Sequence, residues 1–190
     1  MRIREAVPAD VMAVARVHVL SWQWAYRSLM PDEYLDSLRP EDRAARYDFS
    51  HADPRKPHTI VAEEDAGSII AFATTMPSQD AEFAGCGELC GLYAHPAHWG
   101  RGVGVALVTA ARRHLVDSGF ERALLWVLDG NHRAERFYRL DGWRPDGHTR
   151  EEVVWGIKVS DARFVRSLSV NKVEPVSRTG SNGSPDFLPE

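Results

Sequence analysis

Three glycines at alternate positions, just before a stretch with helical spacing, constrain this chain more than any other feature. Gly100, Gly102 and Gly104 stand in the segment HPAHWGRGVGVALV. Glycine loses more backbone entropy on folding than any other residue, so a cluster at the entrance of a helix needs a reason. A helix N-terminus presents unpaired N–H groups and a partial positive charge, which attract phosphate groups. The loop therefore predicts phosphate binding, assisted by Arg101, unless the glycines serve only a tight strand-to-helix turn.

Two familiar phosphate loops do not match this segment. A P-loop needs a lysine followed by serine or threonine after its last glycine, and no such pair follows here. The dinucleotide fingerprint is G-x-G-x-x-G, whereas Gly104 comes one position early and Val105 follows it. The loop also lies in the middle of the chain and not after its first strand. A nucleotide-phosphate binder is therefore a weaker alternative.

Strand and helix patterns follow one another along the chain, which predicts a mixed sheet with helices on its faces, the α/β or α+β class. Gly91 inside a strand pattern predicts a bulge or a close backbone approach, and Asn131 is expected to cap the helix that follows it. The expected strands cover residues 2–7, 58–65, 68–76, 87–95, 122–128, 152–159 and 162–170. The expected helices begin near Asp10, Asp32, Pro40, Val103 and Asn131. We expect one domain over residues 1–168 and a flexible tail over 169–190, where Ser, Gly, Pro and Asn dominate.

Composition excludes several classes of protein. The net charge of −4 argues against a nucleic-acid partner, because such proteins normally carry a basic excess. Two cysteines are too few for a disulfide scaffold, and their spacing does not predict a metal site. The N-terminus lacks the apolar stretch of a signal peptide, and no segment is long and apolar enough to span a membrane. We therefore expect a cytoplasmic protein with no metal, no membrane and no nucleic-acid partner.

Two motifs resemble the GNAT superfamily of acyl-CoA-dependent N-acetyltransferases. The first is GELCGLYAHPAHWGRGVGVALV, in which Gly102 and Gly104 fit the family pattern [QR]-x-x-G-x-[GA], while Trp99 stands where glutamine or arginine is usual. The segment VHVLSWQWAYRSLMPDEYL is similar to a bacterial branch of that superfamily. The second motif, N-x-x-A-x-x-F-Y-x-x-x-G-[FW], is met at Asn131, Ala134, Phe137, Tyr138, Gly142 and Trp143.

The resemblance implies a largely antiparallel sheet of about seven strands, splayed between the fourth and fifth, and acetyl-CoA as co-substrate without a metal. It implies that backbone N–H groups of the glycine loop hold the pyrophosphate, that the pantetheine arm lies along residues 92–94, and that a backbone N–H near Leu92 or Tyr93 meets the thioester oxygen. Tyr138 is implied as the acid for the departing sulfur, and Asn131 as a helix cap that also touches the cofactor. The cofactor-binding residues expected are Leu92, Tyr93, Ala94, Gly100, Arg101, Gly102, Val103, Gly104, Val105 and Asn131.

The acceptor and the general base stay open at this point. Trp22, Trp24 and Tyr26 are expected to bind a small-molecule or peptide amine, opposite a loop over residues 79–83 that carries Asp80 and Glu82, although tryptophans in this position also serve as core packing. Glu88 is the first candidate base, with Asp129, His18 or a water chain as alternatives. A homodimer is one assembly that such folds adopt. The chain is thus expected to transfer an acetyl group to a primary amine by direct attack in a ternary complex; the alternative is a noncatalytic acyl-CoA sensor or interaction module.

Overall fold

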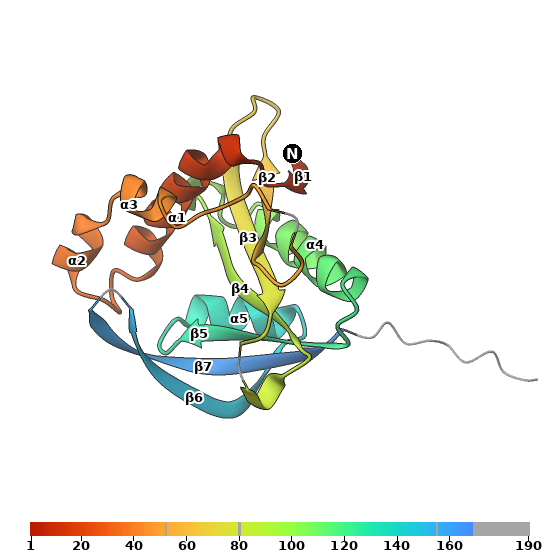
Figure 1. Ribbon diagram of the computed structural model, residues 1–190. Helices are drawn as coiled ribbons and strands as arrows, with labels where there is room; N and C mark the ends of the chain where they lie inside the picture. Colours follow the sequence, from red (N-terminus) through yellow and green to blue (C-terminus); the bar gives the residue numbers. More distant parts are fainter. Residues whose placement is uncertain (52, 80, 155, 169–190) are drawn as a thin grey trace, which may run out of the picture.

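The computed structural model describes residues 1–51, 53–79, 81–154 and 156–168, so the expected tail at 169–190 lies outside the described residues, as does Asp80. Seven strands form one sheet in the order β1-β2-β3-β4-β5-β7-β6 (Figure 1). The strands are β1 (Arg2–Glu5), β2 (His58–Glu63), β3 (Ile69–Pro77), β4 (Gly87–Ala94), β5 (Arg122–Leu128), β6 (Arg144–Val154) and β7 (Ile157–Ser167). The helices are α1 (Val11–Ala25), α2 (Asp32–Ser37), α3 (Pro40–Ala44), α4 (Val103–Asp117) and α5 (His132–Leu140), with short 3-10 turns at Pro8–Asp10, Ala81–Phe83 and Pro96–His98.

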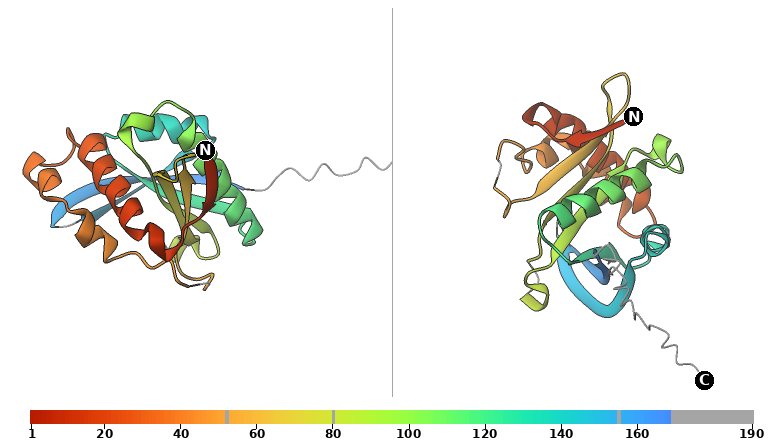
Figure 2. Two further views of the ribbon diagram at one scale, coloured as in Figure 1. Left: turned by 90° about the horizontal axis from the view of Figure 1, so that it is seen from above. Right: turned by 90° about the vertical axis from the view of Figure 1, so that its right-hand side faces the viewer.

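Helices cover both faces of the sheet, as expected. The views of Figure 2 place α1 and α4 on opposite sides of β2–β4. The alternation of side chains along β3 explains this arrangement, because successive residues point to opposite faces. Ala71 and Ala73 pack in the cluster that contains α4, whereas Phe72 between them packs with Val14 and Val17 of α1. The apolar run from Ile69 to Ala73 in this strand therefore supplies two core layers.

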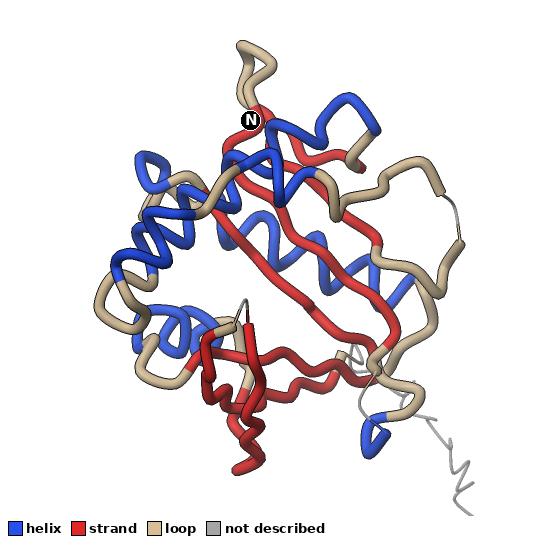
Figure 3. The backbone as a smooth tube through the Cα atoms, turned by 60° about the vertical axis from the view of Figure 1, so that its left-hand side comes forward, coloured by secondary structure: helices blue, strands red, loops and turns tan. Residues whose placement is uncertain are grey.

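The sheet opens between β4 and β5, which confirms the expected splay. These two strands are parallel and pair only at Gly87↔Ala123 and Glu88↔Leu124; every other strand pair is antiparallel. Beyond Glu88 the strands diverge, and Figure 3 shows β5–β7 turning away from the strands of the first half. The sheet therefore consists of two parts, which we call blades: β1–β4 form the first and β5–β7 the second. The two blades are joined only where β4 and β5 begin.

The interior glycine of β4 lies beside a bulge. Thr74 of β3 is opposite Gly91 and Thr75 is opposite Leu89, which leaves Cys90 as the extra residue. A Cβ at Gly91 would lie 2.7 Å from Cε2 of the Tyr93 ring, closer than real contacts allow. Gly91 therefore permits Tyr93 to fold back over its own strand, at the level where β4 leaves β5.

The closing strands differ from the expectation. The sequence pattern predicts a single strand over residues 152–159, but the structure has a hairpin there, with β6 ending at Val154 and β7 beginning at Ile157. Gly156 has φ +85°, a conformation that glycine adopts without strain and that turns the chain. Apolar residues on both sides of the turn make the two strand ends resemble one continuous strand. The expected fold, with a mixed and largely antiparallel sheet, is otherwise confirmed.

Candidate active site

A cleft of about 450 Å³ lies where β4 and β5 diverge. Its walls are the end of α1, β4 beyond the bulge, the glycine loop with the first turn of α4, and β5 with α5. The topology brings these segments together, because the loops after parallel strands leave the sheet at the same edge. Most of the expected cofactor residues line this cleft: Leu92, Tyr93, Ala94, Gly100, Gly102, Val103, Gly104, Val105 and Asn131. Arg101 is not among the lining residues.

The glycine loop needs glycine for two different physical reasons, backbone conformation and lack of space for a side chain. Gly100 and Gly102 have φ +73° and +84°, so a side chain there would be strained although the space around each is open. Gly104 is helical, and a Cβ on it would lie 3.3 Å from the Phe137 ring of α5. The first intrahelical bond of α4 runs from the Ala106 N–H to the Gly102 carbonyl at 3.0 Å. The preceding N–H groups of the first turn thus have no partner inside the helix and are available to an anion.

The free edge of β4 presents backbone groups to the same cleft. The His95 N–H donates to β3 at 2.8 Å. Backbone N–H groups alternate sides along a strand, so those of Leu92 and Ala94 point away from β3. They point to the side where β5 no longer pairs with β4. The Ala94 carbonyl on this edge accepts hydrogen bonds from Ser21 Oγ and Trp99 Nε1, both at 2.8 Å. Of the two N–H groups expected to meet the thioester oxygen, those of Leu92 and Tyr93, the strand register therefore aims that of Leu92 into the open slot.

Tyr138 reaches the cleft from α5. The residue is 8% exposed, and its ring packs at 5.1 Å from Phe137 and 6.3 Å from Trp143, measured between ring centroids. Among the residues that the structure describes, no hydrogen bond to its phenol is present. Burial raises the pKa of Tyr138 well above the usual value for a phenol, and the neighbouring phenol of Tyr93 adds to the shift. Tyr138 is therefore a protonated donor at neutral pH.

Asn131 caps α5 as expected, its Oδ1 accepting from the Ala134 N–H at 3.1 Å.

A cation that the sequence analysis missed lies at the same cleft. The Arg133 guanidinium stacks over the Trp99 ring at 3.4 Å from the ring centroid, and both residues line the cleft. Trp99 occupies the position where the family motif usually has glutamine or arginine, so α5 brings a cation to this position, whereas the loop's own Arg101 is not among the lining residues. The sequence shows this arginine two residues after the Asn131 cap. It does not show that Arg133 lies beside the glycine loop, because that contact depends on how α5 packs against the loop.

The aromatic residues expected to bind the acceptor are separated by the fold. Tyr26 lines the cleft. Trp22 is 8% exposed and packs in a core cluster with Leu35 of α2 and Val159 of β7. Trp24, in contrast, is 66% exposed at the surface. The structure therefore brings one of the three to the cleft, and the acceptor-binding role remains a prediction.

The candidate bases are also scattered. Glu88 occupies the last paired position between β4 and β5 and does not line the cleft. His18 is buried, stacks on the Tyr93 ring at 4.3 Å between centroids, and hydrogen-bonds through Nδ1 to the Tyr47 hydroxyl. Burial, with the nearby Arg43 charge, lowers the pKa of His18 well below the usual range, so it is neutral. Asp129 is exposed just after β5.

Two further features bear on the expectations of metal and membrane. Within the described ranges, His, Cys, Asp and Glu form no group of three or more that could hold a metal ion. No helix in the described part of the chain has the length and apolar character needed to cross a bilayer.

Known proteins resemble this chain in both sequence and fold. Residues 18–143 match the Acetyltransferase (GNAT) family. The uncharacterized N-acetyltransferase YuaI of Bacillus subtilis is 29% identical over 129 residues, which are 68% of this chain and 72% of that protein. The uncharacterized N-acetyltransferase Rv2669 of Mycobacterium tuberculosis is 31% identical over 141 residues, 74% of this chain and 86% of that protein.

The fold is shared with PaiA N-acetyltransferase from Thermoplasma acidophilum, solved in complex with coenzyme A. The TM-score is 0.67 at 21% identity, over 87% of this chain and 98% of that one. The family match covers residues 18–143 and includes the glycine loop, Tyr138 and the cleft between the blades. The chain therefore belongs to the GNAT family of acetyltransferases.

Proposed function

We propose that this acetyltransferase transfers an acetyl group from acetyl-CoA to a primary amine by direct attack in a ternary complex. The observation that carries the proposal is the convergence of three features on one cleft: the unpaired N–H groups at the start of α4, the free edge of β4 and the protonated phenol of Tyr138. When bound, acetyl-CoA supplies an acetyl group activated as a thioester.

The cleft fits the anionic part of this cofactor. The N–H groups of Val103, Gly104 and Val105 line it without helical partners, and the dipole of α4 favours negative charge there. Arg133, held in place by the Trp99 ring, adds a full positive charge at the same mouth of the cleft. A guanidinium suits phosphate oxygens because it donates several hydrogen bonds in a planar fork. Backbone amides and Arg133 together hold the phosphates in this proposal.

The free edge of β4 suits the pantetheine arm. Amides in that arm can pair with Leu92 and Ala94 as a further strand would, which fills the gap left by β5. The Leu92 N–H then polarises the thioester carbonyl, and a preorganised donor of this kind contributes about 3 kcal/mol to a developing oxyanion. Tyr138 gives its proton to the sulfur as the carbon–sulfur bond breaks, and the attacking amine loses a proton to water, or through water to Glu88.

Two measurements test this function. Calorimetry on the full chain is expected to show coenzyme A binding, and acetyl-CoA with a broad amine panel is expected to release free thiol. Arg133→Gln should weaken coenzyme A binding at least tenfold, since a hydrogen bond to a charged group contributes about 1.5–3 kcal/mol. Arg136→Gln is the matched control, because Arg136 lies on the same helix but outside the cleft. No coenzyme A uptake, or no thiol release with any amine, refutes the proposal.

A further inference from the structure

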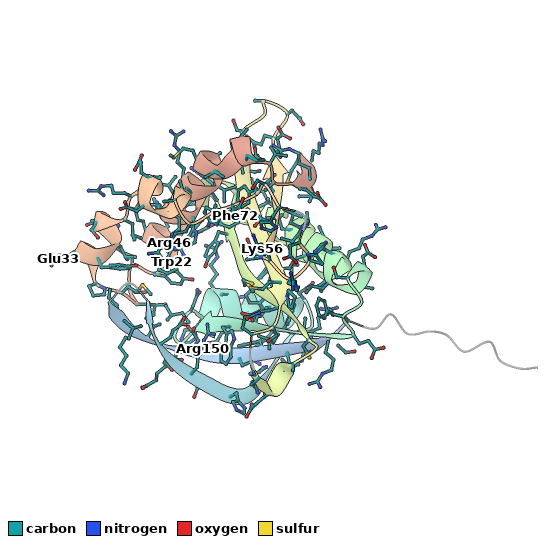
Figure 4. The ribbon with its side chains drawn as sticks, in the orientation of Figure 1. Trp22, Glu33, Arg46, Lys56, Phe72 and Arg150 are labelled. Carbon is teal, nitrogen blue, oxygen red and sulfur yellow. The ribbon has the colours of Figure 1, made fainter. Side chains whose placement is uncertain are left out.

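A second cavity, of about 310 Å³, lies at the other end of α4 from the glycine loop. The first turn of α4 lines the cleft, whereas its last turn and C-cap line this cavity with His114, Leu115 and Ser118. A helix of 15 residues is about 22 Å long, so the two places are well separated. The other walls come from the ends of β1 and β3, the start of β2 and the segment that precedes β2, whose Lys56 is labelled beside β3 in Figure 4. The volume is at the lower end of the range for small-molecule sites, about 300–1,000 Å³.

A buried hydroxyl in this cavity lacks a hydrogen-bond partner. Thr75 of β3 is 2% exposed, and its Oγ1 has no partner among the described residues. In the strand register Thr75 is directly opposite His58 of β2 and Leu89 of β4, and Leu89 packs in the core cluster that contains residues of α4. Residues directly opposite in neighbouring strands point to the same face, so Thr75 faces the cavity that it lines at the end of α4. Because a buried hydroxyl without a partner is unfavourable, the group that completes its hydrogen bonding must come from inside the cavity.

Two stacked imidazoles lie beside Thr75. The rings of His58 and His114 are 3.7 Å apart between centroids and 10° from parallel. Burial lowers the pKa of both, and at His114 the neighbouring His58 adds to the shift, while Glu5, whose Oε1 is 3.9 Å from His58 Nε2, opposes it. Both rings are therefore neutral at pH 7, and each has one nitrogen that accepts a hydrogen bond. A third imidazole, that of His51, lines the cavity with an Nδ1 that has no partner among the described residues.

The walls of this cavity carry more negative than positive charge. The carboxylates of Glu5, Asp48 and Asp53 line it, and among the described lining residues Lys56 is the one lysine or arginine. Arg55, which is outside the lining, pairs with Asp53 at 3.0 Å. The last turn of α4 adds the negative end of the helix dipole. Three carboxylates and a helix C-terminus thus stand against two cations, and this balance favours a positively charged occupant.

We propose that this cavity is a second ligand site, which binds a small amphipathic ammonium ion. The N–H groups of the ion hydrogen-bond to Thr75 and the neutral imidazoles, and its carbon chain packs on the apolar part of the lining, formed by Phe49, Met76, Leu115 and Phe120. The site is independent of the proposed acetyl transfer, because the cavity and the cleft share no lining residue.

Three five-carbon probes test the class of ligand. At neutral pH pentylamine is a cation, 1-pentanol is neutral and pentanoate is an anion. Each is titrated into the full chain at constant pH and ionic strength while the histidine ring signals are followed by NMR. Pentylamine is expected to shift the signals of His58 and His114 saturably, whereas His132 and His148, which are exposed and outside the cavity, should keep theirs. 1-Pentanol should bind about tenfold more weakly, and pentanoate should not bind.

Thr75→Val tests the hydroxyl itself, because valine replaces Oγ1 with a methyl group. Pentylamine binding should weaken about tenfold, since a hydrogen bond to a charged group is lost. The melting temperature of the ligand-free variant should rise, because the substitution removes a buried polar atom that has no partner. Thr149→Val is the matched control: Thr149 is exposed on β6, outside the cavity, and its replacement should change neither quantity.

The outcomes keep this site and the acetyl transfer apart. Pentylamine binding that leaves the His58 and His114 signals in place, or that Thr75→Val does not weaken, overturns the proposal. Pentanoate binding as tight as that of pentylamine overturns it as well. If pentylamine does not bind at millimolar concentration, the proposal is also wrong and water alone satisfies the Thr75 hydroxyl. Coenzyme A binding and thiol release should be equal in wild type and Thr75→Val, so a failure of those two assays in the wild type counts against the acetyltransferase function and leaves this site intact.

Discussion

Replacing Tyr138 with phenylalanine should reduce catalysis while leaving stability unchanged. The variant removes one oxygen atom and keeps the ring, whose edge contacts with Phe137 and Trp143 hold it in place. The phenol has no hydrogen-bond partner among the described residues, so no internal bond is lost. The free energy of unfolding should therefore change by less than about 0.5 kcal/mol.

The effect on the reaction should be much larger. General acid catalysis contributes about 10²- to 10⁴-fold, and a thiolate is a moderately good leaving group, so a loss of about 10²-fold in kcat is expected. The acid must be protonated, and burial raises the pKa of Tyr138 above the ordinary value of about 10. The wild-type enzyme should therefore keep its acid through pH 10, and no decline from this group should occur below that pH.

The assay follows free thiol released from acetyl-CoA at saturating amine between pH 7 and pH 10, beside thermal unfolding and coenzyme A calorimetry. Wild type and variant should bind coenzyme A alike and unfold alike, and differ in kcat. If Tyr138→Phe turns over as fast as wild type, Tyr138 is a packing residue and the departing sulfur takes its proton elsewhere. If wild type binds coenzyme A without turnover, the chain is a sensor on this fold.

Further predictions concern the scaffold. Asp10→Asn should lower the free energy of unfolding by about 2 kcal/mol at pH 7, because Asp10 is 7% exposed and accepts two hydrogen bonds from Arg4 at 2.6 and 3.0 Å. The hydrogen bonds from Arg4 lower the pKa of Asp10. The stabilisation by the Asp10 carboxylate is therefore present above the ordinary pKa of about 4 and should be lost in acid titrations as the pH falls below that value. Equal acid sensitivity of wild type and variant would contradict this prediction. Gly102→Ala should cost about 1 kcal/mol in denaturant melts, because φ is +84°, and a neutral result would mean that the loop relaxes. Trp143→Ala should cost about 3–5 kcal/mol by the same measurement, because this core side chain is 0% exposed, and a loss below 1 kcal/mol would show that the site collapses around the gap.

Local sequence signals predicted the parts of this protein that depend on near neighbours. The Asn131 cap, the glycines of the loop before α4 and the seven-residue run of β5 each act within a few positions, so their structures follow from the residues themselves. The sequence pattern does not predict the hairpin between β6 and β7. The apolar residues at the end of β6 continue into those at the start of β7, and a single glycine, Gly156, marks the turn between them.

The motifs at the glycine loop and at Tyr138 also indicate one chemistry through their residues alone, because GNAT proteins repeat those residues at that spacing. The sequence by itself thus determined the family, the order of the elements and most of the residues that line the cleft.

Only the tertiary structure decided which side chains from distant segments come together at and beside that cleft. Arg133 stacks on Trp99 from a helix more than thirty residues later, and Asp161 meets Arg150 across a strand register. Trp22 and Trp24 are two positions apart, yet one enters the core and the other faces solvent, while Tyr26 reaches the cleft. The physical reason is that burial and charge pairing depend on the packing of distant segments, whereas turns, caps and strand patterns depend on the chain close by.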